Sequence, residues 1–206
     1  MKASGQLRLT NGRRLVSPPG LNTRPTTSRV REALMNILAS RLSGSRWLDL
    51  CCGSGVMGCE AIERGAMAIT AVDRDARCTR ICAQNLRSVA DASKASIEIN
   101  VIRADLENWL RRGWSTEPFD LIYFDPPYEG GIYQTVLALL AQGNFLQSDG
   151  LLICEHRSKT KPPIDAAWVL HDQRRYGSSS LMLLSPPERC HHAGTDSRQP
   201  RTGPEG

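Results

Sequence analysis

The chain has 206 residues, which suits one domain with a full hydrophobic core. Its formal net charge of +5 suits an anionic partner, and no apolar stretch approaches the roughly 18 residues of a membrane-spanning helix. The polar N-terminus lacks the apolar core of a signal peptide, so we expect a cytoplasmic protein. Seven cysteines without a CxxC pair indicate reduced, mostly buried thiols. No metal is predicted, because the one candidate zinc cluster has the wrong ligand spacing: Cys190, His191 and His192.

Residues 1–22 are predicted to form a basic β-hairpin and a loop. Asn11-Gly12 is a favoured two-residue turn, and within Gln6–Val16 it is flanked by leucines in rough alternation. Ser17–Asn22 is rich in Pro and Gly and is predicted to be the loop. Three arginines would lie on or beside the hairpin, where they either keep its edge soluble or contact nucleic acid: Arg8, Arg13 and Arg14.

The segment Thr23–Leu42 is predicted to contain a helix, because its apolar residues from Val30 to Leu42 recur on a single face. Thr27 or Ser28 can cap its N-terminus. Basic side chains near a helix start oppose the helix dipole, so they are unfavourable unless an anion is close. This favours phosphate contact over a plain solvated face for the three arginines found there: Arg24, Arg29 and Arg31.

A glycine-rich loop is predicted between a strand and a helix in Arg46–Gly58. A short apolar strand runs into Gly53-Ser54-Gly55, and glycines there let the backbone approach a ligand at the helix N-terminus. The segment is not the full G-x-G-x-x-G fingerprint that cradles a phosphate. Because the acidic Asp49 comes just before it, the loop better suits a ligand that carries an amino-acid cation.

The second predicted strand, Ala68–Val72, ends at Asp73. This residue follows the glycine loop by about 20 positions, where a carboxylate can accept hydrogen bonds from ribose hydroxyls. A helix from Asp75 to about Ala90 follows. Ile97–Ile102 then alternates like a third strand.

Asp105 and Leu106 come directly after the third predicted strand. The carboxylate of Asp105 could accept the amino group of an adenine, with Leu106 against the ring. The alternative is that Asp105 caps a helix over Glu107–Arg112, and this is compatible with the adenine role.

Asp120–Tyr128 combines a strand with an abrupt end. Its continuous run of large apolar residues indicates a strand buried on both faces. The run stops at a Pro-Pro pair, which cannot continue a ladder of hydrogen bonds. Asp125 and the carbonyl of Pro126 could orient a planar nucleobase amine, and Tyr128 could stack on the base. The alternative is a strand that stops at a turn with a solvated aspartate.

The rest of the chain continues the alternation of strands and helices. This pattern predicts an α/β protein with a doubly wound parallel sheet over residues 23–186. Residues 187–206 are polar and rich in Pro, Gly and charge, so we expect a disordered tail. Ligand-type residues follow each of the first four strands and should meet at one edge of the sheet. The remaining predicted elements are a helix at Ile132–Ala141, a strand at Gly150–Glu155 with Glu155 near its end, and a strand pair at Trp168–Leu170 and Ser180–Leu184.

The motifs resemble a known family. LDLCCGSG, AVDRD, RADL and DPPY, in this order, are similar to the motifs of class I S-adenosylmethionine-dependent amino-methyltransferases. RPTTSRVREALMNIL, before the glycine loop, resembles the RsmD family, bacterial enzymes that methylate N2 of a guanine in small-subunit ribosomal RNA. The resemblance covers about Gln6 to Leu184. It implies a seven-stranded, mostly parallel Rossmann-like sheet with an antiparallel last strand and helices on both faces, plus the N-terminal hairpin and helix.

The resemblance also implies the site. S-adenosylmethionine would be held by Asp49, Cys51, Gly53, Ser54, Gly55, Asp73, Arg74, Asp105 and Leu106. The catalytic set would be Asp125, Pro126, Pro127 and Tyr128. The RNA contacts would be Arg8, Arg13, Arg14, Arg24, Thr26, Thr27, Arg29 and Arg31. The implied substrate is guanine 966 of 16S ribosomal RNA, naked or in a partly assembled 30S subunit, and the implied enzyme is a monomer without a membrane partner.

Two alternatives stay open. A DNA adenine-N6 methyltransferase can carry the same DPPY tetrapeptide, although this chain has no segment large enough to form a domain that reads duplex sequence. A catalytically silent RNA-binding or assembly protein could keep the fold, although the intact Asp125 and glycine loop argue against it. Methylation of adenine in duplex DNA would identify the first, and absence of cofactor binding would identify the second.

Overall fold

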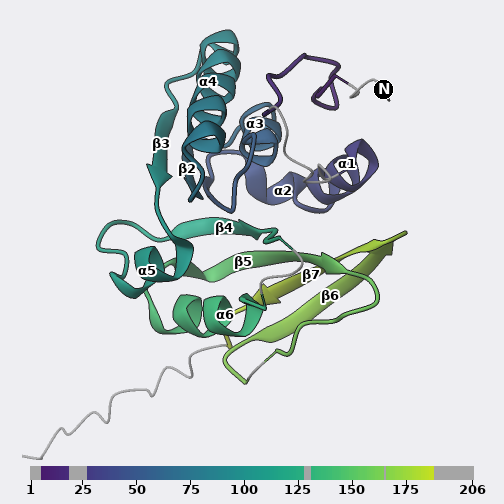
Figure 1. Cartoon of the computed structure of the whole chain (residues 1–206), viewed down its shortest axis with the longest axis vertical. Helices are drawn as coiled ribbons and strands as arrows, with labels where there is room; N and C mark the ends of the chain where they lie inside the picture. Colours follow the sequence, from purple (N-terminus) through teal and green to yellow (C-terminus); the bar gives the residue numbers. More distant parts are fainter. Residues whose placement is uncertain (1–5, 19–26, 128–130, 165, 188–206) are drawn as a thin grey trace, which may run out of the picture.

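The computed structural model describes residues 6–18, 27–127, 131–164 and 166–187. This part of the chain contains a seven-stranded sheet with the order β3-β2-β1-β4-β5-β7-β6 (Figure 1). Strands β1 to β5 pair in parallel, and β7 is antiparallel to both of its neighbours. The predicted mostly parallel sheet is therefore confirmed. The strands are β1 (Arg46–Leu50), β2 (Ala68–Asp73), β3 (Glu98–Arg103), β4 (Phe119–Phe124), β5 (Leu146–Arg157), β6 (Val169–Tyr176) and β7 (Ser179–Ser185).

Helices cover both faces of the sheet. The described helices are α1 (Ser28–Ile37), α2 (Ala39–Leu42), α3 (Val56–Ile62), α4 (Ala76–Ser93), α5 (Leu106–Arg111) and α6 (Tyr133–Gln142). One hydrophobic cluster joins the sheet to α1, α3 and α4, and a second joins its other face to α5 and α6 (Figure 1). Neighbouring strand residues alternate between the clusters, as Trp47 and Leu48 do. Because both faces are covered, β1 and β4 are each buried at every position but one.

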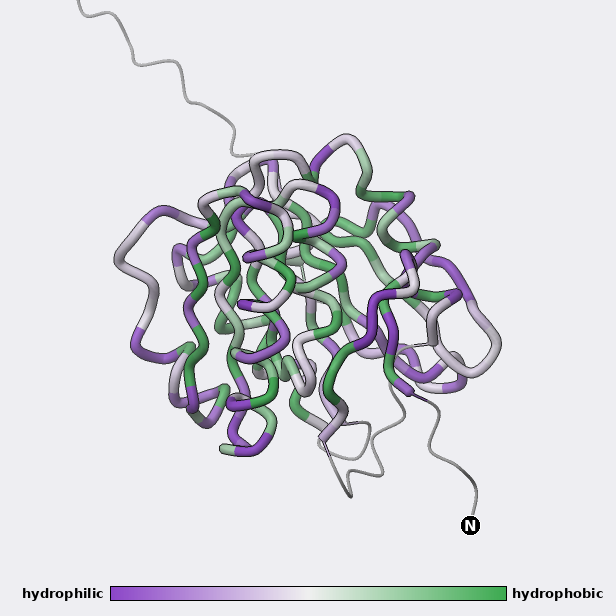
Figure 2. Tube along the Cα trace, turned by 90° about the horizontal axis from the view of Figure 1, so that it is seen from above, coloured by the Kyte–Doolittle hydropathy of each residue, from purple (hydrophilic) through white to green (hydrophobic). Residues whose placement is uncertain are grey.

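The direction in which the chain winds changes between β1 and β4. From β1 the sheet grows through β2 and β3 on one side, and through β4 and β5 on the other. In open α/β sheets, ligands bind outside the carboxyl ends of the strands at such a switch point. Hydrophobic segments run through the interior of the molecule and hydrophilic segments lie mainly at its periphery (Figure 2). Among the described residues, no helix is long and apolar enough to cross a membrane.

The N-terminal arm, residues 6–18, forms a hairpin with a single antiparallel bridge between Arg8 and Arg14. Its turn differs from the predicted Asn11-Gly12 pair. The amide of Gly12 donates to the carbonyl of Leu9 (2.9 Å), and Gly12 has a φ of 88°, so the loop has three residues with glycine in the left-handed position. Three leucines fix the arm to the core cluster that contains α1 and α3: Leu7, Leu9 and Leu15.

The helix predicted within Thr23–Leu42 is divided at Leu38 in its described part. Thr27 caps α1 by accepting a hydrogen bond from the amide of Val30 (3.4 Å), while residues 23–26 lie outside the description. At Leu38 the helical pattern tightens, since the amide of Arg41 donates to the Leu38 carbonyl three residues earlier (2.8 Å). Leu38 and Leu42 are both fully buried.

A buried carboxylate on α3 attaches the arm and α1 to the main domain. Glu60 has no exposed surface. Its Oε1 accepts from the amide of Thr10 (2.9 Å) and from Nε of Arg31 (3.2 Å). Its Oε2 accepts from the Thr10 hydroxyl (2.8 Å) and from Arg64 (2.8 Å). Arg31 also donates to the carbonyl of Arg8, so one acidic group connects four segments of the chain.

Candidate active site

Three acidic side chains from three strand ends converge at the switch point. Asp49 belongs to β1, Asp73 ends β2, and Asp125 follows β4. All three act electrostatically on the thiol of Cys51, and together with burial, which is the largest cause, they raise the pKa of that thiol to about 12. The carboxylates therefore surround one point at the carboxyl edge of the sheet, where their negative charge favours a cationic ligand.

Asp49 is the most buried of these acids, with an exposed fraction of 2%. Burial is the main cause that raises its pKa to about 8, Asp73 raises it further, and a hydrogen bond from the Gly58 amide opposes the change. The Oδ2 atom of Asp49 has no hydrogen-bond partner among the described residues. A buried acceptor without a partner is costly, so this oxygen suits a ligand ammonium group. The residues present therefore fit the amino-acid cation of S-adenosylmethionine.

The glycine loop, residues 51–55, turns sharply above Asp49. Cys51, Gly53 and Gly55 have φ values of 65°, 53° and 73°, which lie in the left-handed region. The loop is held by hydrogen bonds from the Cys52 amide to Val72 (3.1 Å) and from the Gly55 amide to Cys52 (2.7 Å). A Cβ atom on Gly55 would lie 2.6 Å from Sγ of Cys82, whereas one on Gly53 would meet open space. Gly55 thus serves packing on α4, and Gly53 leaves room for a ligand.

We expect Gly55→Ala and Gly53→Ala to have separable effects. Gly55→Ala should lower the free energy of unfolding by about 2 kcal/mol or more, because it adds a clash with Cys82 to the left-handed strain. Gly53→Ala carries only the strain, so it should cost about 1 kcal/mol less and act mainly on cofactor affinity. Urea unfolding and calorimetric titration with S-adenosylhomocysteine, the demethylated product, measure the two quantities. Equal destabilisation by both changes would contradict this assignment.

Asp73 and Arg74 lie beside the glycine loop. Oδ2 of Asp73 accepts from the amide of Gly53 (2.9 Å), and Oδ1 accepts from the amide of Asp75 (2.9 Å). Asp73 therefore braces the glycine loop, a role the sequence did not indicate, and it is half-buried at the site predicted for a ribose. The guanidinium of Arg74 opposes the pKa elevation of Cys51, so its positive charge lies near the same thiol.

Asp105 caps α5, which was the alternative considered for it. Its Oδ1 accepts from the amide of Asn108 (3.0 Å), while Leu106 is buried with an exposed fraction of 8%. One carboxylate oxygen is used by the cap, so the group keeps acceptor capacity at the end of β3. The adenine contact stays a proposal.

The DPPY segment continues from β4 at the same edge. Asp125 is half-buried, Pro126 is buried and Pro127 is exposed, while Tyr128 lies outside the described residues. Phe124 pairs with Cys154 of β5, so Asp125 and Glu155 follow at the same level of the sheet. Glu155 is 2% exposed, and its Oε2 accepts from the hydroxyl of Tyr123 (2.7 Å). The sequence placed Glu155 near a strand end but did not predict this buried bond beside the candidate catalytic segment.

The predicted RNA contacts divide into three groups. Arg8, Arg14 and Arg29 are exposed, and Arg13 is half-exposed with an ion pair to Glu63 (3.3 Å). Thr27 is the N-cap of α1, and Arg24 and Thr26 lie outside the described residues. The prediction for Arg31 was wrong. Only 3% of this residue is exposed, and its guanidinium forms an ion pair with Glu60 and donates to the Arg8 carbonyl. It stabilises the fold and does not present its charge to RNA.

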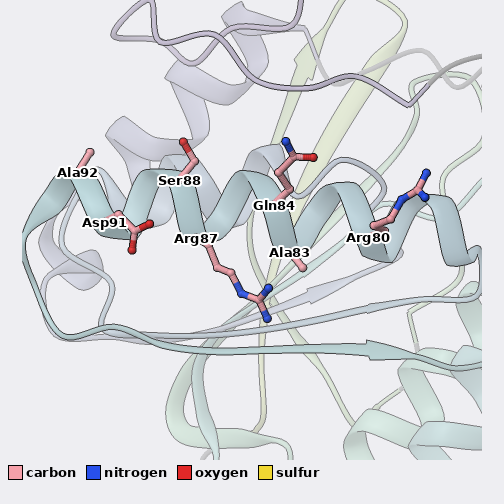
Figure 3. Close-up of a pocket in the computed structure, with 7 residues that line it drawn as sticks. All are labelled: Arg80, Ala83, Gln84, Arg87, Ser88, Asp91 and Ala92. Carbon is pink, nitrogen blue, oxygen red and sulfur yellow. The ribbon is translucent and has the colours of Figure 1, made fainter.

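A surface depression runs along α4 (Figure 3). Its charged lining side chains are Arg80, Arg87 and Asp91. None of its described lining residues belongs to the predicted cofactor or catalytic sets. The carboxyl edge of the sheet is therefore the candidate site because of its converging acids and its glycine loop.

The raised pKa of Asp49 predicts that cofactor binding releases a proton. In the ligand-free protein a pKa of about 8 keeps Asp49 mostly protonated at pH 7, whereas an adjacent cation favours the carboxylate. Cofactor affinity should therefore rise by roughly fiftyfold between pH 6 and pH 8, because the deprotonated fraction of Asp49 rises from about 1% to about one half, and it should level off above pH 8. Calorimetric titration with S-adenosylhomocysteine at pH 7, in buffers of different ionisation enthalpy, counts the released protons.

Asp49→Asn is the matched variant for this titration. It should release close to one proton fewer than the wild type at pH 7, and its affinity should change less with pH. The same proton makes stability depend on pH: the native state binds it up to about pH 8, while an unfolded aspartate loses it near its ordinary pKa of 3.8. The Asp49 contribution to stability thus falls as pH rises through that window, and the asparagine variant should lack the fall. Equal proton release by both proteins would refute the assignment.

Comparisons with known proteins show which family this chain resembles. The family model described as Conserved hypothetical protein 95 matches residues 3–185. Bacillus subtilis YlbH is 34% identical over 174 residues, which cover 84% of this chain and 92% of that protein. Ribosomal RNA small subunit methyltransferase D of Haemophilus influenzae is 31% identical, over 88% of this chain and 94% of that protein. The solved structure of yhhF from Escherichia coli has a TM-score of 0.76 at 28% identity and covers 90% of this chain and 100% of that one. This chain therefore belongs to the Conserved hypothetical protein 95 family, the RsmD family of methyltransferases.

Proposed function

We propose that this protein transfers a methyl group from S-adenosylmethionine to the exocyclic N2 amine of a guanine in small-subunit ribosomal RNA. The observation that carries the proposal is the placement of Asp125 and Pro126 beside Asp49 and Asp73 at the switch point of the sheet. Relatives named Ribosomal RNA small subunit methyltransferase D, in Haemophilus influenzae and Escherichia coli, support the RNA substrate. Position 966 of that RNA is the specific guanine we propose.

Each acidic residue has a distinct proposed role toward the cofactor. When bound, S-adenosylmethionine supplies an electrophilic methyl group on a cationic sulfonium. Asp49 would accept the ammonium group through its unpartnered Oδ2 atom. Asp73 would accept the ribose hydroxyls while it braces the glycine loop, and Asp105 with Leu106 would hold the adenine.

The proposed catalytic role of Asp125 and Pro126 is to position the amine. The lone pair of a guanine amine is delocalised into the ring, so the amine is a poor nucleophile. Acceptors aimed at its N–H groups orient it and favour a pyramidal nitrogen. Positioning of this kind can supply about 7–11 kcal/mol in well-oriented systems. Asp125 need not be a strong base, since the proton can leave after methyl transfer, and Tyr128 would stack on the unstacked base.

The RNA would be held by the basic N-terminal region. Arg8, Arg14 and Arg29 are exposed, and each can contact a phosphate. A looped or single-stranded guanine is the preferred target, because its unstacking costs only a few kcal/mol. The substrate is either naked RNA or a partly assembled 30S particle.

Transfer of labelled methyl groups tests the proposal. The acceptors are naked small-subunit RNA and partly assembled small subunits, both from a strain that lacks the enzyme. N2-methylguanine at one position would support the proposal, and the preferred acceptor would show when in assembly the protein acts. Label in adenine, or in added duplex DNA, would identify the DNA methyltransferase alternative. Cofactor binding without any label would reject the substrate, and absence of cofactor binding would reject enzymatic function.

A further inference from the structure

Asn85 connects the N-terminal arm to the glycine loop. It lies on α4 and is 2% exposed. Its Oδ1 accepts from the amide of Val16 (2.9 Å), and its Nδ2 donates to the carbonyl of Val16 (2.9 Å) and to the carbonyl of Ser54 (2.9 Å). The buried side-chain amide of Asn85 therefore uses both of its N–H groups and its carbonyl. Its partners, Val16 and Ser54, belong to two segments that lie far apart in the sequence.

The two segments that Asn85 joins belong to different parts of the proposed site. Ser54 stands between Gly53 and Gly55, whose left-handed conformations shape the proposed cofactor loop. Val16 is the last residue of the hairpin segment that carries Arg8 and Arg14. A shift of the arm would break two of the three hydrogen bonds of a buried side chain, which is costly. The orientation of the Ser54 carbonyl therefore depends on whether the arm is docked.

The arm is also attached through Glu60, and this contact does not involve the glycine loop. Glu60 binds the turn of the arm through the amide and hydroxyl of Thr10. Its other hydrogen-bond partners in the described chain are Arg31 and Arg64, and neither belongs to the glycine loop. The Glu60 contact thus serves attachment alone, whereas the Asn85 contact also reaches the glycine loop.

We propose that Asn85 is a positioning residue that couples RNA binding by the arm to cofactor binding by the glycine loop. This inference rests on the proposed function, because it assigns RNA to the arm and S-adenosylmethionine to the loop. RNA that orders the arm would also order the Ser54 carbonyl, so each ligand would bind more tightly in the presence of the other. Such coupling is reciprocal: both ligands must gain the same factor in affinity.

The coupling factor is measured from two titrations. Filter binding with labelled small-subunit RNA gives the RNA dissociation constant with and without saturating S-adenosylhomocysteine. In the wild type we expect the cofactor product to tighten RNA binding by about fivefold or more, the lower end of typical coupling between sites. Calorimetry with S-adenosylhomocysteine, with and without RNA, should return the same factor.

Asn85→Asp is the informative variant because it keeps the shape of the side chain and removes both N–H donors. Its carboxylate would face the carbonyl oxygens of Val16 and Ser54, so the connection is lost. We expect the coupling factor to fall to about 1 and the affinity for S-adenosylhomocysteine to fall on the order of tenfold, because buried hydrogen bonds are lost. A merely structural role would lower the melting temperature and leave the ratio of the two RNA dissociation constants unchanged.

Two further variants keep the test decisive. Thr10→Val removes the hydroxyl bond to Glu60 and keeps the amide bond, so it should weaken the attachment of the arm and RNA binding and leave the coupling factor near the wild-type value. If Asn85→Asp does not fold, Val16→Pro removes the donor on the arm side at a residue that is 41% exposed, and it should reduce the coupling. The inference would be overturned if Asn85→Asp kept the wild-type coupling factor. If that variant does not fold, the same outcome in Val16→Pro would overturn it. Wild-type protein that binds both ligands without mutual effect would overturn it too, whereas failure of either ligand to bind would reject the proposed function itself.

Discussion

Asp125→Ala is expected to reduce methyl transfer by about 10²–10³-fold while cofactor affinity stays near that of the wild type, a loss typical of removing one group that stabilises a transition state. The reason is the position of Asp125, which directly follows the buried strand β4 and precedes a buried proline. Its carboxylate would hold the N–H groups of the target amine, so its loss affects the reacting geometry. The measurement is single-turnover methyl transfer at saturating RNA and cofactor.

Asp91→Ala is the matched control for this change. Asp91 is an exposed aspartate on α4, outside the predicted cofactor and catalytic sets, so turnover should be unchanged. S-adenosylhomocysteine titrations of all three proteins separate the roles of the residues. If Asp125→Ala loses cofactor binding together with turnover, then Asp125 holds the cofactor and does not position the amine.

Arg31→Met is expected to cause a large loss of stability with little direct effect on RNA contacts. Arg31 is 3% exposed, and it contributes the fully buried partner to an ion pair with Glu60, which has no exposed surface. Removing one partner of a buried pair costs about 3–5 kcal/mol, and because Arg64 still contacts Glu60 in the variant, we expect a loss at the lower end of this range. For a chain of this size we expect the melting temperature to fall by roughly 6–15 °C, measured by calorimetry or circular dichroism.

Two arginines serve as controls for Arg31→Met. Arg64 contacts the same carboxylate with a side chain that is 25% exposed, so Arg64→Met should cost about 1 kcal/mol or less. Arg29 is exposed on the same helix, so Arg29→Met should leave stability unchanged and weaken RNA binding at low salt. If Arg31→Met instead weakened RNA binding with unchanged stability, the original assignment of Arg31 as an RNA contact would be correct.

The fold was largely predictable because strands buried on both faces leave a clear pattern. Leu121–Phe124 is a continuous apolar run, and all four of its residues are buried in β4. Parallel strands point the same way, so acidic residues after separate strands had to meet at one edge, as Asp49, Asp73 and Asp125 do around Cys51. The placement of the site followed from strand direction alone. The number of strands and the antiparallel last strand came from the resemblance.

The polar contacts inside the protein could not be predicted. An arginine near a helix start has the same sequence signature whether it is solvated or buried, so Arg31 was assigned to RNA. The acidic Glu60 inside the apolar segment VMGCEAI was the available signal of a buried partner. Its contacts come from positions 29 and 50 residues away, and periodicity carries no information about such distances. The same holds for Asn85, whose three bonds depend on how the arm folds back.

The attachment of the arm has a consequence for the order in which the protein folds during synthesis. Thr10 binds a residue 50 positions later, and Val16 binds one 69 positions later. The arm must therefore wait until α3 and α4 have emerged from the ribosome before it can dock. Contacts between residues that are distant in sequence also form slowly. An N-terminal segment of this protein thus reaches its final place only after segments that are made later.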